Sequence, residues 1–254
     1  MGTLGSEFIK LRRSMSWAVV LLLPSIMVWA GTASTSISAQ GFTNGWDTLW
    51  IRSIGFYGMA ILSVGIAILS SLVWRVEHRN GNWNALASTP TPLTYLIVAK
   101  TVTIALLGAV MHIVFVIAVI IAGKIYGLPG ILPARYFAAS LLIIIACLPV
   151  AAIQSTISCL IRSFAIPIAL ALVFTGASTM ALMMHIPGLS HLPYAALTHA
   201  TQMGSTLTFG NNTVFATETV NIGSAFRVVI LALTSTIAVI IGTSLVLNRS
   251  DIRA

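Results

Sequence analysis

Six long apolar stretches run along this chain, and shorter segments rich in polar residues separate them. The hydrocarbon core of a bilayer is about 30 Å thick, so a helix that crosses it needs about 20 mainly apolar residues. The pattern therefore predicts an all-α membrane protein with a single transmembrane domain over residues 1–254. We expect its six transmembrane helices at residues 15–33, 54–74, 97–123, 136–161, 164–184 and 225–247.

The segment before the first apolar stretch, residues 1–14, combines apolar and basic side chains. Phe8 and Ile9 are apolar, whereas Lys10 and Arg12 place positive charge towards the end of the segment. This arrangement fits an interfacial helix that lies along the membrane surface. It fits equally well the ordinary positive flank that precedes a first transmembrane helix.

The most concentrated polar segment between two spans runs from Glu77 to Lys100, and its loop portion covers residues 75–96. A short helix is expected there before Pro90, with Trp83 presenting an aromatic side chain to a cytoplasmic partner. The alternative is a loop whose tryptophan lies in the interfacial aromatic belt. We expect Lys100 at the membrane edge, where its long side chain carries the amine to the lipid headgroups.

The connecting segments on the opposite side of the membrane differ in length and character. Residues 34–53 are rich in serine and threonine and are expected to form a polar loop, whereas residues 124–135 form a short connection. Residues 185–224 are too long for a simple connector. Their first part, up to Tyr194, mixes apolar residues with helix breakers, which favours a segment that re-enters the membrane or caps a cavity.

Composition and charge add an orientation to this picture. Only 7% of residues are charged and the mean hydropathy is +0.99, whereas soluble domains carry about 25% charged residues. Short cytoplasmic loops carry an excess of Lys and Arg, so the basic flanks predict a multi-pass protein of the bacterial plasma membrane with both termini in the cytoplasm. The net charge of +8 then reflects membrane orientation and anionic lipid rather than nucleic-acid binding. The basic residues on the cytoplasmic side are Lys10, Arg12, Arg13, Arg75, Arg79, Lys100, Arg162, Arg249 and Arg253.

The chemistry that is missing is also informative. No zinc-protease, serine-hydrolase or phosphate-binding-loop motif occurs in the sequence, so we expect no catalytic site, metal or cofactor in this chain. Active transport would then need an external energy source. His112 and Gln154, polar residues within spans, are expected to have a structural role as hydrogen-bonding groups between helices, and contact with substrate is the alternative. The acidic residues are expected to lie outside the spans, which argues against an ion-coupled carrier: Glu7, Asp47, Glu77, Glu218 and Asp251.

One spaced pattern in the polar segment resembles a known family. It reads Glu-x3-Gly-x-Trp-x2-Leu-x3-Pro-x9-Lys, and it is similar to the first cytoplasmic loop of ABC exporter permeases of the second type, which have the type V exporter fold. Residues 7–14 resemble the N-terminal segment of these permeases, and residues 186–194 resemble their last external loop. Within the family, the likeness is to lantibiotic-immunity and multidrug permease subunits. The residues of the pattern are Glu77, Gly81, Trp83, Leu86, Pro90 and Lys100.

The resemblance implies roles for these segments. In that family the loop forms a coupling helix that docks on a separate ATPase subunit, which binds ATP and Mg, and two permeases form the transport pathway. The six residues of the pattern thereby become candidates for ATPase coupling, and the interfacial helix would comprise Phe8, Ile9, Lys10 and Arg12. Because helices two and five line the dimer interface in that family, candidates for a substrate cavity are Phe56, Tyr57, Met59, Phe174 and Met180. Core packing or contact with lipid is the competing interpretation for each cavity candidate.

The sequence thus predicts a permease subunit that works with two ATPase subunits and a second permease, identical or related. Its cargo is expected to be hydrophobic or amphipathic, such as an antimicrobial peptide or a drug, because the spans offer aliphatic, Met and Phe surface. A different hypothesis is a non-transporting assembly factor or sensor whose polar loop binds a cytoplasmic partner. An ion-coupled carrier is the third.

Overall fold

The computed structural model of the chain describes most of its length. The described residues are 5, 11, 14–37, 45–78, 93–184, 186, 188, 191–203, 207–209, 212–215 and 220–249. The segments expected to form the interfacial helix and the coupling helix fall almost entirely outside these ranges.

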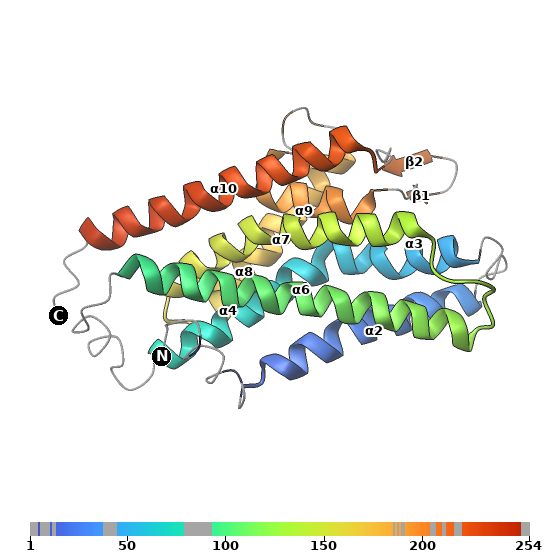
Figure 1. Ribbon diagram of the computed structural model, residues 1–254, viewed down its shortest axis with the longest axis horizontal. Helices are drawn as coiled ribbons and strands as arrows, with labels where there is room; N and C mark the ends of the chain where they lie inside the picture. The colour runs from blue at the N-terminus through green and yellow to red at the C-terminus, as the bar shows by residue number, and fades with distance from the viewer. Residues whose placement is uncertain are drawn as a thin grey trace.

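Six helices among the described residues are long and apolar enough to cross a membrane, and they lie side by side along the long axis of the molecule (Figure 1). The second of these spans joins three elements into one continuous helix, from Trp46 to His78. The predicted all-α, six-span membrane fold is therefore confirmed. In chain order the elements are α2 (Ser16–Ile37), α3 (Trp46–Phe56), the π-helical turn η1 (Tyr57–Ile61), α4 (Leu62–His78), α6 (Leu93–Ile125), α7 (Ala134–Leu160), α8 (Ala165–Met183) and α10 (Ile222–Arg249).

The polar loop expected over residues 34–53 is largely helical instead. α2 continues to Ile37 and α3 begins at Trp46. The hydroxyl of Thr35 donates to the carbonyl of Gly31 at 2.7 Å, so a polar side chain meets its hydrogen-bonding need inside the helix. In α3, Trp50 is fully buried. We expected a loop because the segment is rich in serine and threonine. This expectation was wrong, because both ends of the segment are helical.

α7 forms the centre of the bundle and contacts α4, α6 and α10. Aromatic side chains fill the adjoining core: Trp50 stacks on Tyr136 with ring centroids 4.6 Å apart, and Tyr57 stacks on Phe115 at 4.3 Å. Such offset contacts stabilise a core beyond the apolar area they bury. These residues bind α3, α6 and α7 into one unit.

The last two spans lie at the periphery. Only 22% of the apolar window is buried in α8 and in α10, against 61% in α7. Large apolar side chains therefore face outward along both helices, among them Leu172, Val173 and Ile237. In a membrane protein such faces contact lipid or another subunit.

Between α8 and α10 the chain returns into the bundle as α9 (Pro193–Gln202), which packs against α7, α8 and η1. Packing is close: a Cβ on Gly58 of η1 would lie 2.1 Å from Thr201 Oγ1, so only glycine fits there. A return was expected for the segment ending at Tyr194, whereas the buried helix begins at Pro193 and continues to Gln202. Two short antiparallel strands come next, β1 (Leu207–Phe209) and β2 (Asn212–Phe215).

Candidate functional site

The polar segment from Glu77 to Lys100 is anchored by a buried ion pair between its first and last residues. Glu77 lies in the last turn of α4 and Lys100 lies near the start of α6. Lys100 Nζ is 3.0 Å from Glu77 Oε1, and the side chains are only 0% and 2% exposed, respectively. The pair therefore holds the two helix ends that flank residues 79–92 against each other.

Groups on α4 and α7 surround this ion pair. The ammonium of Lys100 lies 5.1 Å from the ring centroid of Trp74 and donates to the carbonyl of Val73 at 3.4 Å. A cation over the face of an indole is attracted by the ring electrons, more strongly when water is excluded. Trp74 Nε1 donates in turn to Ser155 Oγ of α7 at 3.0 Å. The ion pair is thus tied to three helices.

A second set of hydrogen bonds joins α4 to α7 at the same end of the bundle. His78 Nε2 lies 2.7 Å from the carbonyl oxygen of Ser158, and a carbonyl only accepts, so this nitrogen carries the proton. Ser70 Oγ donates to Ser158 Oγ at 3.1 Å. We call the set formed by Ser70, Trp74, Glu77, His78, Lys100, Ser155 and Ser158 the Glu77 cluster.

The burial of Lys100 corrects one expectation. Its amine does not extend to the lipid headgroups, because the carboxylate of Glu77 offers a partner inside the protein. The helical span from Trp46 to His78 is longer than the expected span of residues 54–74 and includes both Glu77 and Asp47. Each stands near one end of that span, and each pairs with a basic residue of another helix.

Several residues proposed from the sequence lie outside the described residues. For the coupling segment these are Gly81, Trp83, Leu86 and Pro90, and for the N-terminal segment they are Phe8, Ile9, Lys10 and Arg12. Of the coupling candidates, the structure thus describes Glu77 and Lys100 and brings them together.

The cavity candidates are scattered. Tyr57 is fully buried inside the subunit, in a cluster of three rings with Phe115 and His112. Phe174 and Met180 of α8 are exposed. Met59 is half-buried, and its carbonyl accepts a hydrogen bond from Thr179 at 3.2 Å; the side chain of Phe56 is outside the described set.

Sequence reasoning missed the partners of the ion pair on α4 and α7. A signal for α4 was present, because Trp74, Glu77 and His78 are spaced three and four residues apart and so share one face of a helix. Ser155 and Ser158 repeat the three-residue spacing on α7.

The two polar residues expected to form hydrogen bonds within the spans have different outcomes. Gln154 donates from α7 to Tyr194 of α9. The ring nitrogens of His112 have no hydrogen-bond partner in the described part of the chain.

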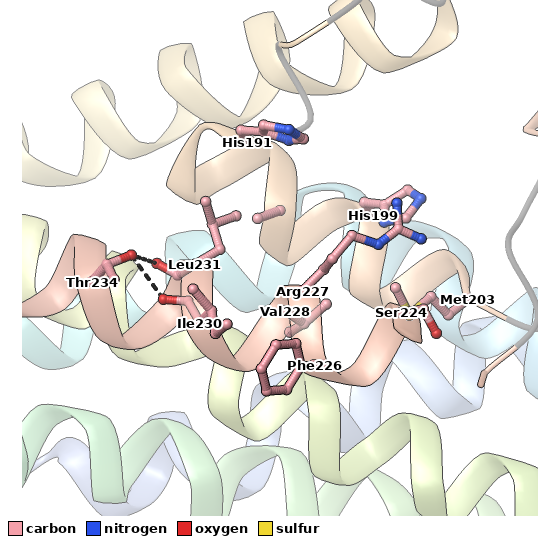
Figure 2. Close-up of a pocket in the computed structure, with 11 residues that line it drawn as sticks. His191, His199, Met203, Ser224, Phe226, Arg227, Val228, Ile230, Leu231 and Thr234 are labelled. Atoms are coloured by element: carbon pink, nitrogen blue, oxygen red, sulfur yellow. Dashed lines mark hydrogen bonds between the residues drawn. The ribbon is translucent and has the colours of Figure 1, made fainter. Parts of the chain in front are cut away.

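A cavity of about 430 Å³ lies at the other end of the bundle, between α9 and α10 (Figure 2). Figure 2 shows the side chain of Arg227 extending from α10 towards α9, which carries His199. Phe226 and Leu231 line the same cavity. Its wall is therefore amphipathic, with basic and apolar side chains next to each other.

The next feature is the arrangement of possible metal-binding side chains among the described residues. No group of three or more His, Cys, Asp or Glu residues there could hold a metal ion. The acidic groups that the structure describes, Asp47 and Glu77, both occur in ion pairs. The contacts of the Glu77 cluster join α4, α6 and α7.

Comparison with known proteins adds one finding. The model of a protein family described as ABC-2 family transporter protein matches residues 3–178. This match spans α2 to α7 and most of α8, and it includes the whole Glu77 cluster. Neither the curated proteins nor the solved structures give a significant match.

Proposed function

The chain belongs to the ABC-2 transporter family, and on this basis we propose that it is the permease of an ATP-driven exporter for hydrophobic or amphipathic compounds. Membership makes it the membrane-spanning subunit of an ABC transporter, which associates with ABC ATPase subunits. The proposal adds the direction of transport, the class of cargo, two ATPase subunits that bind ATP and Mg, and a second permease copy or paralogue. It also places both termini in the cytoplasm of a bacterial cell.

The observation that carries the proposal is the buried Glu77–Lys100 ion pair. An ATPase that pushes on residues 79–92 acts on two helix ends that are already joined, so α4 and α6 would move together. The contacts of Trp74 and His78 pass the same displacement to α7. Rigid movement of packed helices between two states is a common way to convert a local push into a change of access. Gly81, Trp83, Leu86 and Pro90 are proposed to contact the ATPase.

Two further features support the cargo and the second permease. The cavity between α9 and α10 combines Arg227 with apolar side chains, which suits a compound with polar and apolar parts. The exposed apolar face of α8, including Phe174 and Met180, is proposed to meet the second permease and the cargo path. Phe56 and Met59 of the second span are proposed to reach the same path, whereas Tyr57 is buried in the core.

The test compares Trp83→Ala with Trp29→Ala, which removes an exposed tryptophan of α2. Purification from the native membrane should recover P-loop ATPase subunits with the unaltered protein and with Trp29→Ala. Trp83→Ala should lower both ATPase recovery and ATP-driven export about tenfold or more, because tryptophans at interface centres often contribute about 2 kcal/mol. Normal ATPase recovery and export with Trp83→Ala would contradict the coupling role.

The same experiment separates the rival hypotheses. ATPase recovery without any export would favour an assembly factor or sensor. Transport that persists in ATP-depleted vesicles and stops when the proton gradient is removed would favour an ion-coupled carrier.

A further inference from the structure

A second cavity, of about 330 Å³, opens beside the Glu77 cluster, where α4 and α7 end and α8 begins. Arg75 and His78 of α4 and Arg162 of the α7–α8 connection contribute basic side chains to its wall, and Ser71, Ser158 and Ser163 contribute hydroxyls. Among the described residues, no carboxylate lines this cavity. Its wall is thus positive and rich in hydrogen-bond donors.

Ser71 shows that the cavity is built into the bundle rather than lying on its surface. Its side chain is 5% exposed, and its hydroxyl has no hydrogen-bond partner among the described residues. Leaving a buried hydroxyl unpaired is destabilising, so a ligand that accepts a hydrogen bond from it would remove that cost. Arg75 is held nearby, with its guanidinium carbon 6.0 Å from the ring centroid of Phe164.

The first turn of α8 adds to the positive character. α8 begins at Ala165, and its N-cap residue Phe164 forms no side-chain hydrogen bond to the helix. The first N–H groups of a helix without a capping side chain seek acceptors, and the helix dipole favours an anion near them. Ser163 and Phe164 line the cavity at this point.

The depth of the cavity defines where its ligand would lie. It is bordered by the ends of three spans, Trp46–His78, Ala134–Leu160 and Ala165–Met183, which is the level of the lipid headgroups. Phe164 and Leu160 are exposed beside it, as expected where a protein faces lipid. Basic pockets between helices at this level suit anionic headgroups.

From these features we infer that the cavity formed by Ser71, Arg75, His78, Ser158, Arg162 and Ser163 binds a phosphate group at headgroup depth. The guanidinium groups of Arg75 and Arg162 match phosphate oxygens in charge and geometry. The hydroxyls of Ser71 and Ser163 donate to the remaining oxygens. The phosphate can belong to an anionic phospholipid or be free, and this inference holds whether or not the protein exports a cargo.

The test uses the purified full chain in micelles of dodecyl maltoside, a detergent without a phosphate group. Phosphatidylglycerol is added in one series and inorganic phosphate in the other, and binding is read from the thermal stability of the protein and from retained lipid in native mass spectrometry. Stabilisation by phosphatidylglycerol alone identifies a lipid phosphate, whereas equal stabilisation by inorganic phosphate identifies a free one. Either outcome supports the site, and absence of both effects overturns it.

Variants place the effect in this cavity. The double variant Arg75→Gln/Arg162→Gln should weaken the binding at least tenfold, whereas Arg52→Gln, at the other end of the bundle, should leave it unchanged. Equal losses in both would show diffuse electrostatic attraction and overturn the proposal.

Ser71→Ala provides a second, independent check. It should weaken binding about fivefold, in line with one lost hydrogen bond. Without phosphatidylglycerol or phosphate, the same variant should be as stable as the unaltered protein or more stable, because an unpaired buried hydroxyl is removed. Unchanged phosphate binding in Ser71→Ala would contradict the assigned role of this hydroxyl.

Discussion

The two ends of the bundle each carry an ion pair between helices, and the two pairs differ in their access to water. At one end Glu77 and Lys100 join α4 to α6 with 2% and 0% exposure, respectively. At the other end Asp47 and Arg135 join α3 to α7 with 37% and 53% exposure of their side chains, respectively. Tyr136 also donates to Asp47 at 2.7 Å.

The difference in burial gives the two pairs different consequences. An exposed pair contributes about 0–1 kcal/mol, because water solvates the charges whether or not they meet. A buried pair gains little net stability over apolar residues, yet losing one partner leaves an uncompensated charge inside the protein. The Glu77 pair therefore makes separation of α4 from α6 costly, whereas the Asp47 pair adds little to the contact between α3 and α7. Such a contrast suits a bundle that is pushed at the Glu77 end.

The largest effect is expected from Lys100→Met, which removes the ammonium that lies 3.0 Å from the buried carboxylate of Glu77. The free energy of unfolding should fall by about 3–5 kcal/mol, measured as thermal unfolding of the purified protein in detergent. Arg135→Met is the matched control, since it removes the basic partner of the exposed pair and should cost about 1 kcal/mol or less. Equal losses in the two variants would contradict the comparison.

The double variant Glu77→Leu/Lys100→Met should recover most of the stability lost in Lys100→Met. An apolar pair of similar volume avoids the desolvation cost, so the double variant should lie within about 1.5 kcal/mol of the unaltered protein. If the ion pair couples ATPase movement to the helices, ATP-driven export should be lower in this double variant than in the unaltered protein, although the two have similar stability. Export equal to that of the unaltered protein would show that the ion pair has only a structural role.

The sequence was sufficient for the spans because length and apolarity alone decide whether a helix crosses a bilayer. It was also sufficient to single out Glu77 and Lys100, since both interrupt the apolar pattern at the borders of one loop. Their contact could not be predicted in the same way. It depends on how α4 and α6 pack, and a lysine at a span border fits snorkelling equally well.

The rest of the site escaped prediction for a related reason. Ser155 and Ser158 look like ordinary small residues of a membrane helix, and only the packing of α7 against α4 turns them towards Trp74 and His78. The helical part of residues 34–53 was missed because serine and threonine bond back to their own helix. Local composition could not reveal either contact.

A smaller effect is expected from Trp74→Phe, which sharpens the account of the buried end. Phenylalanine keeps a ring near Lys100 but loses the Nε1–H that donates to Ser155. The free energy of unfolding should fall by about 1–2 kcal/mol, from the lost hydrogen bond and a weaker cation–π contact. Thermal unfolding measures this loss. Ser155→Ala should lower stability less in the Trp74→Phe background than alone, and strictly additive losses would exclude the bond as the shared cause.

The smallest effect is expected at the exposed end, from Asp47→Asn. The amide oxygen can still accept from Tyr136, so only the charge opposite Arg135 is lost, and stability should fall by less than about 1 kcal/mol. This loss should shrink further as NaCl is raised from low ionic strength to about 1 M, where the Debye length is only about 3 Å. Glu77→Gln should show no such dependence, because water and ions do not reach Lys100. A salt response of equal size in both variants would mean that the two ion pairs are solvated alike, and the contrast between a buried pair and an exposed pair would fail.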